Sequence, residues 1–549
     1  MSDETTSTTE STQEHTKDEI HELEAQRRAN RDAVADLGLD PYGGIAGELH
    51  TLAAAAAAYD QAADLANQES DAARRVFKKD HPDAPESDYP ALVDDRPRVR
   101  IAGRVVLHRD NGKLVWMNLR DDTRETFQIA VSKRDCDELG FGVAKKTDLG
   151  DLVVAEGPLM RTKAGEVTVW ASSLRPAGKC LVPPPEKRAG LTNVETRYRQ
   201  RYLDLWATPE TLRTFQLRCR IVSEMRRMLE SWEYVEVETP MLQAQAGGAA
   251  ARPFVTHMNA LDIELFLRIA PELYLKRLLV GGMPRVFEIN RNFRNEGLDK
   301  QHNPEFTMLE LYHAHGDWTT VMDMTERLTR GLARFTAELR AGEEGVDPNG
   351  PVLPWGDLRI DFGPPFRRVR YADLFEQTLG FPMSDTARAR DEAAKRGIKT
   401  TNDKGVEIDD VFVINELFEE VAESTLDPAQ PTFITHYPAA ISPLTKASKA
   451  EPEFAERADL FLAGMELAPH YTELNDPDVQ AARFREQLAG IDDEESTFRN
   501  FDEDFIRALK VGMPPAGGMG LGIDRLAMIL TGEKTIRDVV LFPLMRPEG

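Results

Sequence analysis

The stretch RVFEINRNFRNEGLDKQHNPEFTMLELY, from Arg285 to Tyr312, decides the fold of the larger part of this chain. Read with a period of two, its first half separates an apolar set of side chains from a polar set. Its second half separates in the same way, and a polar run from Gly297 to Asn303 lies between the halves. The pattern predicts an antiparallel hairpin with a long loop and one buried face.

The other face of this hairpin gathers groups that suit a nucleotide and an amine. The guanidinium of Arg294 offers a planar fork of donors for a phosphate. Glu296 can accept from an exocyclic amino group, and Phe306 can stack under a base. Glu310 and Tyr312 remain for a cationic or hydrogen-bonding substrate. The alternative is an ordinary sheet whose polar face meets water, but the ordered combination of these groups favours a binding face.

A second motif, GMGLGIDRLAMIL, runs from Gly518 to Leu530. Its first glycines alternate, so one face of the predicted strand carries no side chains and a flat ring can approach the backbone closely. Asp524 is a candidate cap for the helix that follows, which places Arg525 at the helix start. A glycine strand by itself is more often structural than functional.

Together these segments resemble the class II aminoacyl-tRNA synthetases, in their lysyl-tRNA synthetase form. FRNEG and HNPEFTMLELY resemble motif 2 of that family, and GMGLGIDR with TIRDVVLFPLMRP resembles motif 3. RIAPELYLKRLLVGG (residues 268–282) fits the same family. WEYVEVETPML (residues 232–242) resembles motif 1, which forms the dimer interface in the family. The resemblance covers roughly residues 20–45 and 95–549.

The resemblance implies an enzyme that activates L-lysine with ATP and transfers it to tRNA(Lys), working as a cytoplasmic homodimer. It implies catalytic roles for Arg294, His302 and Arg525. The implied ATP-binding residues are Arg294, Glu296, His302, Asn303, Phe306, Glu466 and Arg525. Asp459 and Glu466 match positions where the family bridges Mg²⁺ to the phosphates, and hard oxygen ligands suit that ion.

The side chain of lysine sets the strictest requirement, because a buried ammonium needs carboxylate partners. The resemblance implies a lysine-binding set made of Gly248, Glu272, Arg294, Glu310, Tyr312, Tyr471 and Glu473. A single buried glutamate is more often part of a structural salt bridge, so the set is judged by its joint placement. One departure stands out: Pro469 occupies a position where the family usually has asparagine. Proline has no side-chain or main-chain donor, so His470 is a candidate replacement.

The bulk composition is that of a multidomain protein without membrane spans. The chain has 549 residues and a formal net charge of −25, a length that predicts two to four domains. No run of 18 apolar residues occurs, and the acidic start has no signal-peptide pattern. The three cysteines lie far apart, which indicates a reducing compartment and excludes a disulfide framework or zinc ribbon.

Residues 96–180 have a different character from the acidic segment before them. They hold 16 Lys+Arg against 11 Asp+Glu, and five short alternating runs predict a small closed β-barrel, an OB-fold. Within it, the resemblance points to Trp116 as a residue that stacks on an unpaired anticodon base. Arg104 and Gln128 are expected to contact phosphate and base edges. The alternative is that Trp116 belongs to the barrel core.

The expected fold class is α+β: an N-terminal OB-fold barrel followed by an antiparallel sheet flanked by helices. The predicted segments are a disordered acidic tail (1–19), N-terminal helices with an alanine-rich insertion over 52–80 and a linker (20–95), the barrel (96–180), a hinge (181–206) and the catalytic domain (207–549). The last includes a helical lobe near 380–430. Two further hypotheses stay open: a paralogous ligase that joins lysine to a protein or small molecule, and a degenerate synthetase with a regulatory binding role.

Overall fold

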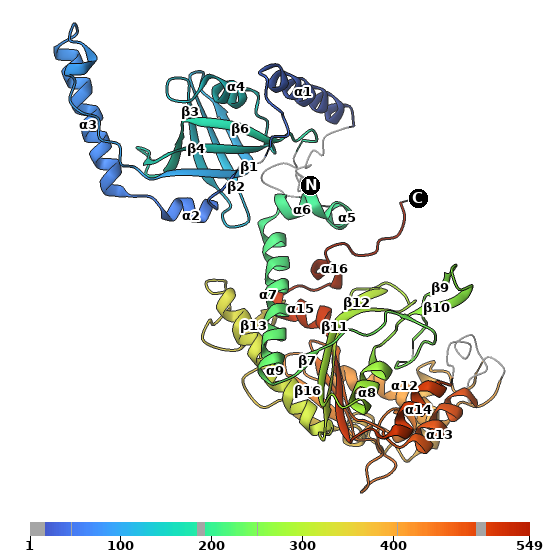
Figure 1. Ribbon diagram of the computed structural model, residues 1–549. Helices are drawn as coiled ribbons and strands as arrows, with labels where there is room; N and C mark the ends of the chain where they lie inside the picture. The colour runs from blue at the N-terminus through green and yellow to red at the C-terminus, as the bar shows by residue number, and fades with distance from the viewer. Residues whose placement is uncertain are drawn as a thin grey trace, which may run out of the picture. The chain divides into compact units, whose positions relative to one another are not determined.

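The computed structural model describes residues 17–44, 47–183, 191, 193–249, 251–402, 405–489 and 501–548. Two compact units divide the chain, each described by itself below (Figure 1). The first comprises residues 1–193 and 202–209, and the second comprises residues 194–201 and 210–549. Residues 1–16 of the predicted acidic tail lie outside the described residues.

The first unit is built on the predicted barrel. Its strands run in the order β1-β2-β3-β5-β4-β6, and pairing of β1 with β4 closes the sheet. The predicted last run is interrupted at Ser172, and its two parts, β5 and β6, pair one after the other along β4, so the barrel closes with five strands as expected. Alternate side chains point inward and form the barrel core. The strands are β1 (Arg98–Asp110), β2 (Leu114–Arg120), β3 (Phe127–Ser132), β4 (Leu152–Arg161), β5 (Val167–Ala171) and β6 (Ser173–Gly178).

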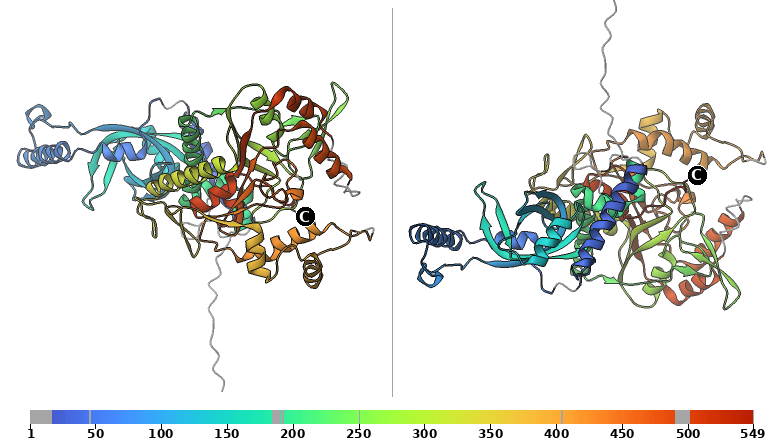
Figure 2. Two further views of the ribbon diagram at one scale, coloured as in Figure 1. Left: turned by 90° about the horizontal axis from the view of Figure 1, so that it is seen from below. Right: turned by 90° about the horizontal axis from the view of Figure 1, so that it is seen from above.

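Helices flank this barrel on its N-terminal side. The alanine-rich segment forms α2 (Leu52–Ala57) and α3 (Gln61–Asp80) rather than one helix. The chain breaks between them because Asp60 caps α3, accepting from the amides of Ala62 and Ala63. In Figures 1 and 2, α3 projects away from the strands beyond its first turn, where the amide of Arg161 in β4 donates to the carboxylate of Asp64 at 2.8 Å. The helix α4 (Glu138–Lys146) covers one end of the barrel, as expected for an OB-fold.

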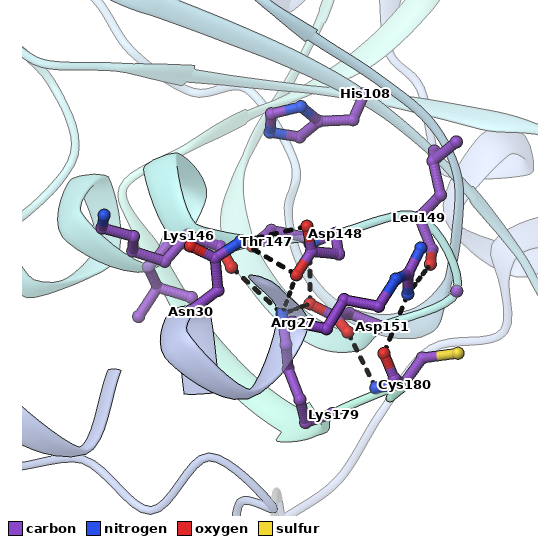
Figure 3. A network of polar contacts seen from close by, with 12 residues as sticks. Arg27, Asn30, His108, Lys146, Thr147, Asp148, Leu149, Asp151, Lys179 and Cys180 are labelled. Carbon is purple, nitrogen blue, oxygen red and sulfur yellow. Dashed lines mark hydrogen bonds and ion pairs between the residues drawn. The ribbon is translucent and has the colours of Figure 1, made fainter. Parts of the chain in front are cut away.

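The first helix, α1 (Lys17–Asp36), is attached to the barrel by polar contacts (Figure 3). The guanidinium of Arg27 donates to the main-chain carbonyls of Leu149 and Cys180, each at 2.8 Å. One turn on, the amide of Asn30 donates to both carboxylate oxygens of Asp148 at 3.1 Å. Val34 adds an apolar contact because it belongs to the barrel core. The helix and the barrel therefore share one packing unit.

The second unit contains an eight-stranded, largely antiparallel sheet in the order β15-β16-β17-β18-β19-β12-β11-β7. Only the two edge pairs, β15 with β16 and β11 with β7, are parallel. The strands are β7 (Val235–Glu236), β11 (Arg285–Phe293), β12 (Glu305–Ala314), β15 (Arg367–Arg370), β16 (Thr432–Thr435), β17 (Arg457–Leu462), β18 (Met465–Thr472) and β19 (Ala516–Gly522). The predicted α+β class and the antiparallel sheet are confirmed.

Three helices cover one face of this sheet: α7 (Pro209–Ser231), α9 (Trp318–Leu339) and α15 (Ile523–Thr531). Their apolar stripes pack with inward residues of β11, β12 and β19 into the largest core of the chain. The opposite face is partly covered by α8 (Glu272–Val280) and by a small sheet of β8 (Leu242–Gln243), β9 (Val255–Met258) and β10 (Ile263–Leu267). That face carries the predicted site residues.

Further helices and strands complete the two units. Where the lobe near 380–430 was expected, α11 (Thr386–Lys395) and α12 (Asp410–Leu417) pack into a separate apolar cluster with α10 (Tyr371–Leu379). The others are α5 (Val194–Arg199), α6 (Arg201–Ala207), β13 (Val352–Trp355), β14 (Leu358–Asp361), α13 (Pro477–Ala489), α14 (Glu503–Gly512) and α16 (Ile536–Val539). All three cysteines are free thiols.

Candidate active site

The predicted hairpin is formed by β11 and β12, joined by the polar loop (Figure 1). Phe287, Leu309 and Leu311 are fully buried in the core below the sheet, as the period-two pattern predicts. Glu288 stands opposite Glu310 on the other face. Both glutamates are almost fully buried as well, so this face is an enclosed polar site rather than a solvated surface.

One pocket at the loop end of the hairpin collects every residue predicted to bind ATP. Its lining includes Arg294, Glu296, His302, Asn303, Phe306, Glu466 and Arg525. The guanidinium carbon of Arg294 lies 5.1 Å from the centre of the Phe306 ring. The Nε of Arg294 is buried and has no hydrogen-bond partner among the described residues. A buried donor without a partner is costly, so this geometry suits an anionic ligand.

Arg525 closes the other side of the pocket from the first turn of α15. Its Nη1 donates to the main-chain carbonyl of Glu466 at 2.5 Å, and its Nη2 lies 2.8 Å from Nε2 of His302. His302 is held in turn by the carboxylate of Asp299, 2.7 Å from Nδ1. Two guanidinium groups and an imidazole thus converge on one pocket, which favours binding of phosphate groups.

Asp524 does not cap α15, contrary to the prediction. The N-cap of this helix is Gly522, which makes no side-chain cap. The Asp524 carboxylate is buried, accepts from the amide of Thr307 at 2.8 Å and pairs with Arg218 at 2.5 Å. It therefore ties α15 to β12 and α7.

A second polar cluster lies further along the same strands. Two residues along a strand advance roughly 6.6 Å, so each register step leads away from the pocket. In sequence order, Met308 pairs with Gly522, Glu310 with Gly520, and Tyr312 with Gly518. Met308 and Gly520 line the pocket, and Glu310 is the next residue of that face. The cluster is thus continuous with the pocket that Arg294 and Arg525 line.

This cluster contains three glutamates predicted to bind lysine. Glu272, Glu310 and Glu473 are all buried. The hydroxyl of Tyr312 donates to Oε2 of Glu310 at 3.2 Å. Lys276 was not predicted as a site residue, yet its ammonium donates to Oε1 of Glu272 at 2.6 Å and pairs with Oε2 of Glu473. Oε1 of Glu473 has no hydrogen-bond partner within the described part of the chain.

Burial and mutual repulsion shift the protonation of these groups. Burial, reinforced by the charge of Glu272, raises the pKa of Glu310 well above its usual range. Burial also raises the pKa of Glu473 to about 8, although Lys276 opposes the shift. Burial alone would lower the pKa of Lys276, but the charges of Glu272 and Glu473 raise it instead. The cluster is therefore acidic, crowded and short of positive charge.

Bare glycines let these carboxylates approach the backbone. A Cβ on Gly518 would lie 1.9 Å from Oε1 of Glu473 and 2.7 Å from the Tyr312 ring. Gly248, in a left-handed conformation (φ 87°), leaves 3.1 Å between such an atom and Cβ of Glu272. The glycines of the motif thus make room for protein carboxylates as well as for a flat ligand.

The two predicted metal-binding carboxylates differ in their surroundings. Asp459 is buried, and Arg457 holds both of its oxygens at 2.6–3.1 Å. Glu466 lines the pocket, where desolvation and the charge of Asp459 raise its pKa against the opposing guanidinium of Arg525. Among the described residues, no group of three metal-binding side chains forms a cage. Glu466 fits an ion that is also held by phosphate oxygens.

His470 does not replace the missing asparagine side chain. Strand alternation places Pro469 and Tyr471 on the site face and His470 on the opposite one. The His470 ring is fully buried beneath the sheet, 2.7 Å from the hydroxyl of Thr325 and 3.1 Å from the carbonyl of Ala458. Burial lowers its pKa to about 3, so it is a neutral core histidine. Pro469 lines the same pocket as Arg294 and Arg525.

In the barrel unit, Trp116 lies outside the core. Its neighbours Val115 and Met117 are fully buried, so alternation turns the indole outward, where it is half-buried. Ala130 of β3 stands between it and Trp170 of β5. The two indoles meet edge to face with centres 6.3 Å apart.

The other predicted anticodon residues make contacts within their own unit. The amide of Gln128 donates to Glu166 at 2.7 Å and accepts from Thr168 at 2.9 Å. Arg104 donates to the carbonyl of Gly150 and stacks on the ring of Trp206. In the register of β1 and β2, Arg104 stands opposite Arg120. Arg120 lies about 13 Å along β2 from Trp116. Gln128 is buried, whereas Trp116 and Arg104 are both half-buried.

Lys276 and Trp170 are the residues that sequence reasoning missed. Lys276 follows Glu272 by four residues, a helical spacing that brings the two side chains together. Trp170 belongs to an alternating strand, where the parity of buried neighbours indicates an outward side chain. Both signals are visible in the sequence, but the partners Glu473 and Trp116 are distant along the chain.

Comparison with known proteins gives two family matches. Residues 193–546 match the tRNA synthetases class II (D, K and N), and residues 99–177 match the OB-fold nucleic acid binding domain. A lysine–tRNA ligase of Burkholderia multivorans is 46% identical over 470 residues, covering 84% of this chain and 89% of that protein. A lysine–tRNA ligase of Actinobacillus succinogenes is 45% identical over 474 residues, covering 84% and 90%. No helix in the described ranges combines the length and apolarity that a membrane span requires.

Proposed function

Because the chain belongs to the class II tRNA synthetases of the D, K and N group, we propose that it activates L-lysine with ATP and transfers the lysyl group to tRNA(Lys). The observation that carries the choice of lysine is the buried cluster of Glu272, Glu310 and Glu473 beside the nucleotide pocket. Desolvating an ammonium is costly unless carboxylates receive it, and this cluster has an excess of them.

The chemistry we propose needs no covalent nucleophile from the protein. The lysine carboxylate attacks the α-phosphorus of ATP in line, pyrophosphate leaves, and a lysyl-adenylate forms. A hydroxyl at the 3′ end of tRNA then attacks the acyl carbon, and AMP leaves. Arg294 and Arg525 both line the pocket, where fixed positive charge stabilises the transferring phosphoryl group.

Glu466, and Asp459 if Arg457 releases it, would hold Mg²⁺ together with the phosphates of ATP. The ion would neutralise phosphate charge when bound. The position of Glu466 in the lining of the pocket supports this assignment. The bidentate contact between Arg457 and Asp459 makes Asp459 the weaker of the two ligands.

Membership of this family also leads us to propose that the protein binds tRNA, forms a homodimer and works in the cytoplasm. The exposed Val235 on the edge strand β7 supports an interface over residues 232–242. The barrel supports tRNA as the acceptor, because the paralogous ligases that modify proteins or small molecules generally lack it. Its match to nucleic acid binding OB-folds points the same way.

Amino-acid-dependent ATP–pyrophosphate exchange tests the function directly. Each of the twenty amino acids is supplied in turn to the full-length protein, and lysine is expected to give the dominant exchange rate. Charging of purified tRNA(Lys) then tests the second step. If none of the twenty amino acids supports ATP–pyrophosphate exchange, the enzymatic proposal is contradicted and a binding protein is favoured.

Replacing Trp116 with alanine is expected to raise the KM for tRNA(Lys) about 5- to 150-fold, because one stacked base contributes roughly 1–3 kcal/mol. Lysine-dependent exchange should be unchanged, since the adenylate forms in the other unit. Aminoacylation kinetics with varied tRNA provide the measurement. Leu139→Ala, an exposed change on the same barrel, is the control, and equal tRNA kinetics in both variants would refute the stacking role.

The affinity for lysine is expected to rise with pH up to about 8. Glu310 and Glu473 have raised pKa values in the free site, whereas the substrate's ammonium groups favour the ionised carboxylates. Binding therefore releases protons, and KM should fall by about tenfold per pH unit for one coupled proton below pH 8. Exchange kinetics from pH 6 to pH 9 measure the slope. A KM for lysine that stays flat over this range would contradict the linkage.

A further inference from the structure

Lys276 occupies the centre of the carboxylate cluster. Its side chain is fully buried on α8, one turn after Glu272. Its ammonium contacts Glu272 at 2.6 Å and pairs with Glu473. The chain thus supplies one ammonium of its own to carboxylates that the proposed function assigns to the substrate.

The charges around Lys276 can be counted because neighbouring ion pairs are self-contained. Arg268 pairs with Glu288 at 2.6 Å, and Arg457 pairs with Asp459 at 2.6 Å. The remaining groups are three carboxylates and one ammonium. With all of them ionised, the pocket carries a charge of minus two. L-Lysine brings two ammonium groups, while its carboxylate is directed to the guanidinium of Arg294.

We propose that Lys276 is a positioning residue that sets the charge of this pocket at minus two when bound lysine has ionised its carboxylates, matched to an amino acid with two ammonium groups. The inference rests on the proposed function and deepens it. Lys276 is not among the residues that line the proposed nucleotide pocket. Its ammonium orients the carboxylates of Glu272 and Glu473, and its positive charge keeps the net charge of the pocket from reaching minus three.

This role predicts a change in KM for lysine rather than in turnover. Without Lys276, three buried carboxylates would face each other, and at least one would take up a proton or turn away. Lys276→Met is therefore expected to raise the KM for lysine about tenfold or more, with kcat for exchange within a few-fold of the unaltered protein. The pH dependence of KM should also become steeper. Lys510→Met, a change of an exposed lysine in the same unit, is the control.

A charge-compensated pair separates charge matching from simple packing. Glu310→Gln alone leaves a charge of minus one, and Lys276→Met with Glu310→Gln restores minus two. The double variant is expected to bind lysine more tightly than either single variant. If Lys276 only fills space, the double variant will instead be weaker than both. Should Lys276→Met fail to fold, the comparison of Glu310→Gln with the double variant still decides.

The outcome is distinguishable from failure of the proposed function. Lysine-dependent exchange by the unaltered protein establishes the function independently of Lys276. With that exchange present, an unchanged KM in Lys276→Met overturns only the inference. Absence of exchange with every amino acid in the unaltered protein refutes the function itself.

Discussion

Replacing Arg294 with alanine is expected to lower lysine-dependent ATP–pyrophosphate exchange about 100- to 1,000-fold, the range for loss of one preorganised charge partner at a transition state. Arg294 lines the nucleotide pocket, lies 5.1 Å from the Phe306 ring centre and has a buried Nε without a partner among the described residues. Removing it leaves both the stacking surface and the phosphate without their nearest guanidinium. Exchange measured at saturating lysine isolates the effect on turnover.

Arg291→Ala is the matched control for that variant. Arg291 lies near the end of β11, three residues before Arg294, and its guanidinium reaches the surface carboxylate of Glu305 at 3.6 Å. Such exposed pairs contribute about 0–1 kcal/mol, so exchange should stay within a few-fold. Exchange by Arg294→Ala that matches the control would remove Arg294 from the catalytic assignment.

Replacing Gly518 with alanine is expected to raise the KM for lysine at least about 100-fold, because overpacking a buried site displaces its side chains. The new Cβ would stand 1.9 Å from Glu473 Oε1 and 2.7 Å from the Tyr312 ring. One of these groups must move, and both belong to the lysine-binding set. A loss of about 1–3 kcal/mol in stability should accompany the change, measured as a lower melting temperature.

Gly44→Ala controls for the added methyl group itself. At Gly44 a Cβ would have no described atom within 4 Å, and the backbone has no left-handed conformation to strain. Both lysine KM and melting temperature should stay unchanged there. If Gly518→Ala also leaves KM unchanged while the protein remains folded, the placement of Glu473 against the bare strand is wrong.

Much of the site was predictable from strand periodicity. The alternation across the hairpin assigned Arg294, Phe306 and Glu310 to one face. In the structure, Arg294 and Phe306 line one pocket, and Glu310 lies further along β12 from Phe306. The same alternation places His470 on the opposite face from Pro469 and Tyr471. It therefore argued against His470 as a replacement hydrogen-bond donor, which was predicted from the chemistry of its side chain. Local alternation therefore carried more information than side-chain chemistry at that position.

What the sequence did not reveal depends on contacts between distant segments. Asp524 has the residue type and position of a helix cap, yet its carboxylate is used by Thr307 and Arg218. Lys276 looks like one half of an ordinary helical pair with Glu272. Its second partner, Glu473, reaches it only because the sheet brings β18 beside β19. Propensity describes neighbours along the chain, whereas tertiary packing chooses partners.

The attachment of α1 has a practical consequence for dissecting this protein. Two carbonyl acceptors of the barrel, on Leu149 and Cys180, are satisfied by Arg27. A shortened protein that starts at the first barrel strand would leave both to water and would expose the patch under Val34. An isolated fragment that contains the barrel should therefore begin before α1. A fusion of the barrel to another enzyme should likewise include that helix.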